Sequence, residues 1–76
     1  MKQIKDYIEY ELNIFRKECN FSDEELEYFN YKAKDYSNIR ISTEMNTSNS
    51  TIYRISKSVE KKMKRVEELF LTNNKI

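Results

Sequence analysis

The 76-residue chain contains no glycine, proline, histidine or tryptophan, and it has one cysteine. Without glycine or proline, the usual signals for β-hairpins and tight strand turns are missing, so the sequence predicts an all-helical chain. Cys19 has no partner for an internal disulfide and lies on an apolar stripe, which predicts a small buried side chain in a reducing compartment. No apolar run is long enough to span a membrane and no secretory signal opens the chain, so we expect a cytoplasmic protein with no membrane partner.

The same absences argue against catalysis. Histidine, a cysteine pair and a glycine-rich phosphate loop are all missing, so the common metal, nucleophile and nucleotide sites have no residues to build them. The carboxylates of Glu24, Glu25 and Glu27 are better explained as charges that stabilise the start of a helix. We therefore expect neither enzymatic activity nor a cofactor nor a metal site.

Charge is nearly balanced overall but unevenly distributed. Fourteen basic residues face thirteen acidic ones, yet residues 21–36 have a net negative charge and residues 37–76 a net positive one. Between positions 49 and 65, Glu60 alone opposes six cations: Arg54, Lys57, Lys61, Lys62, Lys64 and Arg65. Taken alone, a basic helix face is more often solvated surface than a binding site, but this one concentrates positive potential on a single predicted helix.

Apolar residues recur at helical spacing in four segments. The first helix is predicted from about Lys2 to Cys19, with an apolar stripe of Ile4, Tyr7, Ile8, Leu12, Phe15 and Cys19. The second begins at a capping box of Ser22 and Glu25, flanked by a hydrophobic staple of Phe21 and Leu26, and runs to about Lys34. Its apolar surface is predicted to comprise Leu26, Phe29, Tyr31 and Ala33.

The segment from Ser37 to Ile55 has the layout of a helix-turn-helix. Ile41, Met45, Ile52 and Ile55 fall on the facing sides of two helices, and small Ser42 suits a close crossing. Asn46 can adopt the left-handed conformation that ends a helix, while Ser37 and Ser48 can cap the two helix starts. The second helix continues to about Leu71, ahead of a polar, frayed tail over Thr72–Lys75, because its apolar spacing persists through Ile52, Ile55, Val59, Met63, Val66 and Phe70.

These segments predict a single all-α domain over residues 1–76. Residues 1–20 form a supporting helix, residues 21–66 the helix-turn-helix core, and residues 67–76 the helix end and tail. The apolar stripe from Val59 to Phe70 extends beyond what a three-helix core covers. Either the N-terminal helix folds back along it or two chains pair through it, and we favour a homodimer.

Residues 21–66 resemble the tetrahelical helix-turn-helix domains of LuxR-type regulators and of region four of the primary sigma factors. The matching positions are Phe21-Ser22 followed by acids, Ala33, Ser37-Asn38, Ile41-Ser42, Met45, Ser48, Thr51-Ile52, Val59 and Lys62-Met63. The resemblance implies that the second helix of the motif enters the major groove of DNA, and that a region-four-like domain also contacts RNA polymerase.

The chain departs from this family in four places. Asp35 stands where the family has glycine, Thr47 where it has an aliphatic residue, and Asn49 and Ser50 where region four has a base-reading arginine and glutamate. The promoter sequence of sigma factors therefore cannot be transferred. The length does not suit a complete sigma factor, and a small regulator of phage or mobile-element type fits better.

If the fourth predicted helix enters the groove, its first turns face the bases. The planar fork of Arg54 matches guanine O6 and N7, and Asn49 suits adenine. Tyr53 either joins this surface or packs against the N-terminal helix. Serine and threonine hydroxyls with nearby cations suit phosphate contacts. The predicted DNA-binding residues are Ser37, Arg40, Ser48, Asn49, Ser50, Thr51, Tyr53, Arg54, Lys57 and Lys61.

Taken together, the sequence predicts a sequence-specific transcriptional regulator that binds double-stranded DNA. The alternative, which Asn49 and Ser50 favour, is a protein-interaction module that docks on RNA polymerase or another regulator with little DNA binding. The sequence carries no signature of a ligand pocket.

Overall fold

Four α-helices make up the body of the molecule in the computed structural model, which describes residues 2–71. They are α1 (Glu9–Glu18), α2 (Asp23–Ala33), α3 (Asn38–Glu44) and α4 (Asn49–Val66). A short 3-10 turn, η1 (Ile4–Asp6), precedes α1, and a wider π-type turn, η2 (Glu67–Leu71), continues α4. The predicted all-α class is thus confirmed, whereas the predicted frayed tail over Thr72–Lys75 lies outside the described residues.

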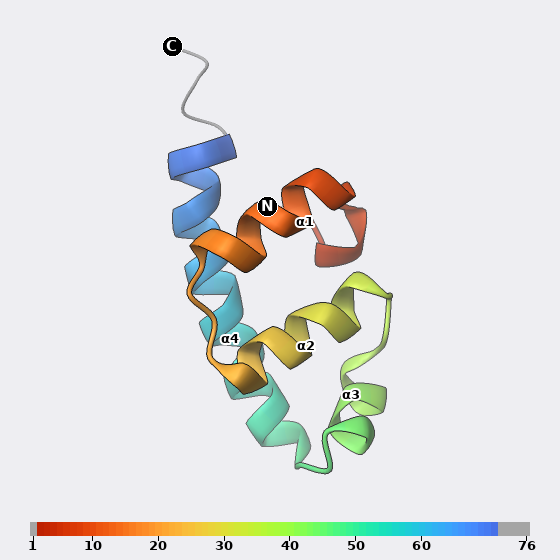
Figure 1. The fold of residues 1–76 in the computed structure, drawn as a ribbon. Coiled ribbons are helices and arrows are strands. Elements are labelled where there is room, and N and C mark those ends of the chain that lie inside the picture. The colour runs from red at the N-terminus through yellow and green to blue at the C-terminus, as the bar shows by residue number, and fades with distance from the viewer. Residues whose placement is uncertain (1, 72–76) are drawn as a thin grey trace.

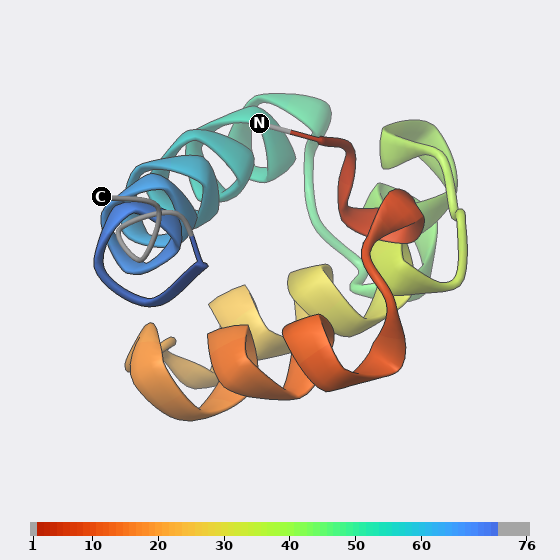
Figure 2. The same cartoon turned by 90° about the horizontal axis from the view of Figure 1, so that it is seen from above.

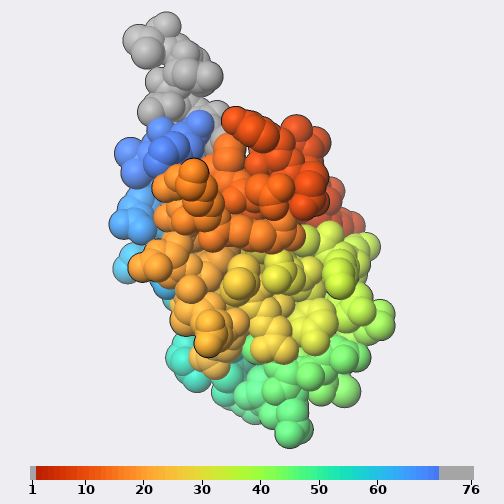
Figure 3. Space-filling view, in the orientation of Figure 1, coloured from red at the N-terminus to blue at the C-terminus, as the bar shows by residue number. Residues whose placement is uncertain are grey.

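The longest helix, α4, packs against each of the other three. Figures 1 and 2 show α1 and α2 running antiparallel beside one another, with α4 crossing behind them and α3 at the far end of α2. In the space-filling view of Figure 3, α1, α2 and α3 form one continuous face, and from this side α4 is visible only along the edge of the molecule. One side of α4 is therefore committed to the core.

The core lies where these helices meet. Its fully buried side chains come from all four: Phe15, Cys19, Phe29, Ile41, Ile52, Val59 and Met63. The rings of Phe15 and Phe29 join α1 to α2 with centroids 6.1 Å apart. Burial raises the pKa of the Cys19 thiol to about 11, which keeps it protonated at neutral pH. The predicted burial of Cys19 is therefore confirmed.

Local chemistry places the helix boundaries. The hydroxyls of Ser22, Ser37 and Ser48 accept backbone N–H bonds at the starts of α2, α3 and α4, so these three predicted caps are confirmed. Asn20, Asp35 and Asn46 have φ angles of 55°, 68° and 55° and end α1, α2 and α3. Asn and Asp are the non-glycine residues that enter the left-handed region most readily. The chain thus reverses three times without a glycine.

The N-terminal segment differs from the prediction of one helix over residues 2–19. Tyr7 and Ile8 are extended, and α1 begins only at Glu9. The Glu11 carboxylate accepts the Ile8 N–H at 3.1 Å, so Ile8 is the N-cap residue and the helix starts at Glu9. The break turns the Tyr7 ring into the core, 4.9 Å from Phe15, and leaves Ile8 63% exposed, so the predicted burial of Ile8 is wrong.

The same break lets the N-terminal segment cover the far end of α4. The Tyr7 hydroxyl donates to Glu67 Oε2 at 2.8 Å, and Val66 is only 2% exposed. The sequence left two ways to bury the apolar stripe of α4, by the N-terminal segment or by a second chain. As far as Val66, the N-terminal segment covers it. Beyond it, Leu69 and Phe70 remain 56% and 49% exposed. This covering removes the sequence argument for a homodimer along Val59–Val66.

None of the helices within residues 2–71 combines the length and apolar character that crossing a membrane requires.

Candidate nucleic-acid interface

The candidate interface begins with a tight turn between α3 and α4. Asn46 closes α3 in the left-handed conformation, and the Thr47 N–H donates to the Ser42 carbonyl at 2.9 Å. Ile41 and Ile52 are fully buried where the helices meet. Ser42 is also buried, and its hydroxyl donates to the Ile39 carbonyl at 2.7 Å, so a small polar side chain at the crossing keeps a hydrogen bond. α3, the turn and α4 therefore form a helix-turn-helix.

α4 has two chemically distinct sides. Every predicted stripe residue from Ile52 to Val66 is buried, at the helical spacing of about 100° per residue. The opposite side carries what we call the basic face, whose members are all exposed: Arg54, Lys57, Lys61, Lys64 and Arg65. This face extends about 16 Å along the helix at ~1.5 Å per residue. This cationic surface is exposed to solvent, whereas the aliphatic side of α4 packs against the other helices.

Most of the basic face is unpaired. Among residues 2–71, no ion pair reaches Arg54, Lys61, Lys64 or Arg65. Lys57 lies 3.8 Å from Glu60, but both side chains are more than half exposed, so water and salt weaken this pair. These ammonium and guanidinium groups are therefore available to phosphate.

Lys62 does not belong to this face, although the sequence grouped it with the other cations. Its ammonium contacts Glu25 Oε1 at 2.5 Å and joins α4 to the start of α2. The buried Glu25 carboxylate also accepts from the Ser58 hydroxyl and the Ser22 N–H. Burial by itself raises the pKa of Glu25, but these hydrogen bonds and the Lys62 charge outweigh it and hold the pKa at about 2.

The sequence missed this cluster because Glu25 was already explained as a capping residue. The contact joins residues 37 positions apart, and only the crossing of α2 over α4 brings them together. Ser58 and Lys62 are four residues apart and therefore lie on the same side of α4. This spacing is the one sequence signal that could have indicated a shared partner. The cluster fixes the orientation of α4 against the core.

The remaining predicted DNA-binding residues divide into caps and exposed groups. The Ser48 hydroxyl accepts the Thr51 N–H at 3.2 Å and donates to Thr51 Oγ1 at 3.0 Å, so both hydroxyls serve the helix start. Tyr53 is 61% exposed, so of its two predicted positions it does not pack against the N-terminal helix. Exposed side chains on the first turns of α4 and at the start of α3 are Asn49, Ser50, Tyr53, Arg54, Lys57, Ser37 and Arg40. Lys61 follows two turns later on the same side of α4.

Arg40 is held in place by a stack of rings. Its guanidinium lies 3.8 Å from the centroid of the Tyr36 ring, and that ring stacks on Tyr31 at 5.1 Å. Such cation–π contacts favour one arginine position at an exposed site. The sequence assigned Tyr31 to the apolar surface of α2 and gave Tyr36 no role, because ring stacking across the link between two helices has no periodic signal.

The fold and the interface define a small all-α domain with a helix-turn-helix and a cationic second helix. Comparison of the chain with protein-family models, with curated proteins and with solved structures returned no significant match. Within residues 2–71, no group of three or more histidine, cysteine, aspartate or glutamate side chains is arranged to hold a metal ion.

Proposed function

We propose that the protein is a transcriptional regulator that binds double-stranded DNA sequence-specifically through its helix-turn-helix. The observation that carries the proposal is the exposed and largely unpaired basic face of α4, which lies opposite a side buried by α2 and α3. A helix so held presents its first turns to base edges in the major groove, which is wide enough to admit it.

Each group has a role that its position suits. Arg54 reads guanine through its two-pronged fork, and Asn49 and Ser50 approach neighbouring bases from the first turn. Lys57 and Lys61 contact phosphates along the groove wall, and Arg40 contacts the backbone from the start of α3. The exposed N–H groups at the start of α4, beside Ser48 and Thr51, add phosphate contacts.

Selection from a pool of random duplexes tests the proposal. The purified protein enriches a defined sequence, and its affinity for that duplex falls steeply with salt because each cation contact releases a counterion. A scrambled duplex of equal length is the control. Selection rounds that return no enriched sequence would contradict the proposal.

A second candidate function is a protein-interaction module that docks on RNA polymerase or another regulator. The exposed side chains of Leu69 and Phe70 favour it, since apolar surface at the end of α4 is suited to a protein partner rather than to phosphate. Retention of RNA polymerase on the immobilised protein, together with a selection that enriches no duplex, would establish this function instead.

The proposal includes three further expectations. The domain belongs with LuxR-type regulators and sigma region four, in a small regulator of phage or mobile-element type. It acts in the cytoplasm, where DNA and RNA polymerase are accessible. It binds as a homodimer on half-sites about 10 base pairs apart, a spacing set by one turn of the duplex, and the exposed Leu69 and Phe70 are the part of the predicted pairing surface that the N-terminal segment leaves uncovered. Sedimentation velocity at micromolar concentration, with and without DNA, measures the oligomeric state.

A further inference from the structure

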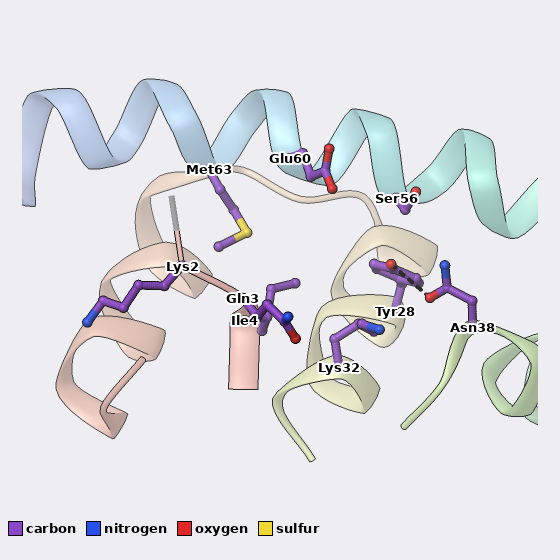
Figure 4. A pocket seen from close by; sticks show the side chains of 9 residues that line it. All are labelled: Lys2, Gln3, Ile4, Tyr28, Lys32, Asn38, Ser56, Glu60 and Met63. Carbon is purple, nitrogen blue, oxygen red and sulfur yellow. Dashed lines mark hydrogen bonds between the residues drawn. The ribbon is translucent and has the colours of Figure 1, made fainter. Parts of the chain in front are cut away.

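A pocket opens beside the helix-turn-helix, where η1, α2, α3 and α4 meet (Figure 4). Its volume is about 220 Å³. Ile4 comes from η1, Tyr28 and Lys32 from α2, Asn38 from α3, and Glu60 and Met63 from α4. The sequence gave no sign of it, because its walls come from segments that only the fold brings together.

One wall of the pocket carries an unpaired positive charge. Lys32 is half-buried, no ion pair reaches it within residues 2–71, and Figure 4 shows its ammonium directed toward Tyr28 and Asn38. Lys2 also lines the pocket, but Figure 4 shows its ammonium directed away from the other labelled side chains. Lys32 is therefore the cation that an anionic group entering the pocket would meet.

Tyr28 and Asn38 line the pocket next to this charge. The Tyr28 hydroxyl donates to Asn38 Oδ1 at 3.1 Å, which orients the Asn38 amide and leaves its N–H₂ group without a partner among the described residues. Figure 4 draws Asn38 Oδ1 on the side of Tyr28 and Lys32 and the amide nitrogen on the other side, so the Lys32 ammonium is the donor on this wall that faces an entering carboxylate.

The opposite wall is negative and partly apolar. Figure 4 shows the Glu60 carboxylate projecting from α4 toward the side of the pocket where Lys32 and Tyr28 lie. Its ion pair with Lys57 is long, at 3.8 Å, and exposed. Near it, half-buried Ile4 supplies an apolar surface, with the fully buried Met63 behind it. A positive group, a negative group and an apolar wall thus surround one small volume.

We propose that this pocket binds a small zwitterion of the apolar α-amino acid class. The ligand carboxylate contacts the Lys32 ammonium, its ammonium contacts Glu60, and its side chain lies against Ile4. The pocket is smaller than the ~300–1,000 Å³ of drug-sized ligand sites, a size that suits a ligand of this class.

Isothermal titration of the whole protein with three probes tests the assignment. L-leucine carries both charges, 4-methylpentanoate lacks the ammonium, and isopentylamine lacks the carboxylate. Leucine is expected to bind with a dissociation constant on the order of millimolar, as suits so few contacting atoms, and each analogue at least ~10-fold more weakly. No heat with leucine, or equal affinity for leucine and either analogue, overturns the proposal.

Variants localise the binding. Lys32→Met and Glu60→Gln each weaken leucine binding at least ~10-fold, since each removes one charged partner. Lys34→Met and Glu44→Gln, which make the same changes at exposed positions away from the pocket, leave the binding unchanged. Unaltered binding in Lys32→Met and Glu60→Gln, or equal losses in the controls, overturns the assignment. Because no DNA is present, this result is independent of the proposed regulatory function.

Discussion

Replacing Glu25 with glutamine tests how α4 is held in position. The substitution keeps the side chain's shape and its hydrogen-bonding carbonyl but removes the charge that Lys62 contacts. The pKa of Glu25 is about 2 in the folded protein, against an ordinary value of 4.5. The difference corresponds to at most about 3 kcal/mol at neutral pH, since each pH unit is worth ~1.36 kcal/mol. Lys62 is 32% exposed, and this solvent access lowers the expected destabilisation to about 2 kcal/mol.

The pH dependence has a definite sign. Because the folded-state pKa is lowered, the stabilisation by Glu25 is fully present above about pH 4.5 and is lost as the pH falls toward 2. Urea unfolding followed by circular dichroism measures the free energy of unfolding of both proteins across this range. The wild type should exceed Glu25→Gln by about 2 kcal/mol near pH 7, with the difference shrinking toward zero near pH 2.

Glu24→Gln is the matched control for this experiment. Glu24 is exposed and occupies the same first turn of α2, so its loss removes an equal charge without touching Lys62. It should change stability by no more than about 0.5 kcal/mol. A Glu25→Gln effect that is constant with pH, or no larger than that of Glu24→Gln, would refute the reasoning.

Three further predictions follow from other contacts. Tyr36→Leu removes the ring under Arg40, so it should weaken DNA binding and reduce by about 1 the slope of log affinity against log salt concentration. Tyr36→Phe keeps the ring and should change neither quantity. Fluorescence anisotropy at several salt concentrations measures the affinity and the slope for each variant. Asn46→Ala should destabilise the fold by about 1 kcal/mol in urea unfolding while Asn46→Gly should not, because alanine resists the left-handed conformation; equal stabilities would contradict this. Cys19, whose pKa is raised to about 11 by burial, should react with a thiol reagent at neutral pH only after unfolding, and rapid labelling of the native protein would contradict its burial.

The features that the sequence predicted correctly are those set by neighbouring residues. A serine cap acts on an amide three positions along, and Asn46 ends a helix by its own conformational preference, so neither depends on distant contacts. The buried stripe of α4 followed from spacing, because an amphipathic helix needs one apolar side whatever covers it. These local effects were enough for the helix-turn-helix and for the exposure of Arg54 and Lys57.

The features that the sequence missed depend on contacts across the fold. The spacing of Ile4, Tyr7 and Ile8 fits a continuous helix equally well, and the chain breaks there because Tyr7 reaches Glu67, sixty positions away. The sequence counted Lys62 with the other cations of this helix and missed its separate role for the same reason, since Glu25 meets it only once α2 crosses α4. The pocket of Figure 4 combines four segments and has no local pattern at all.

The most direct test of the central claim is the specificity ratio, the affinity for the selected duplex divided by that for a scrambled duplex, in wild type and Arg54→Ala. Lys17→Ala, which removes one charge from an exposed site on α1, is the control. If α4 reads bases through Arg54, the substitution should lower the ratio by roughly 5- to 150-fold, the equivalent of ~1–3 kcal/mol, while Lys17→Ala leaves it unchanged. A ratio that is the same in all three proteins would contradict the account.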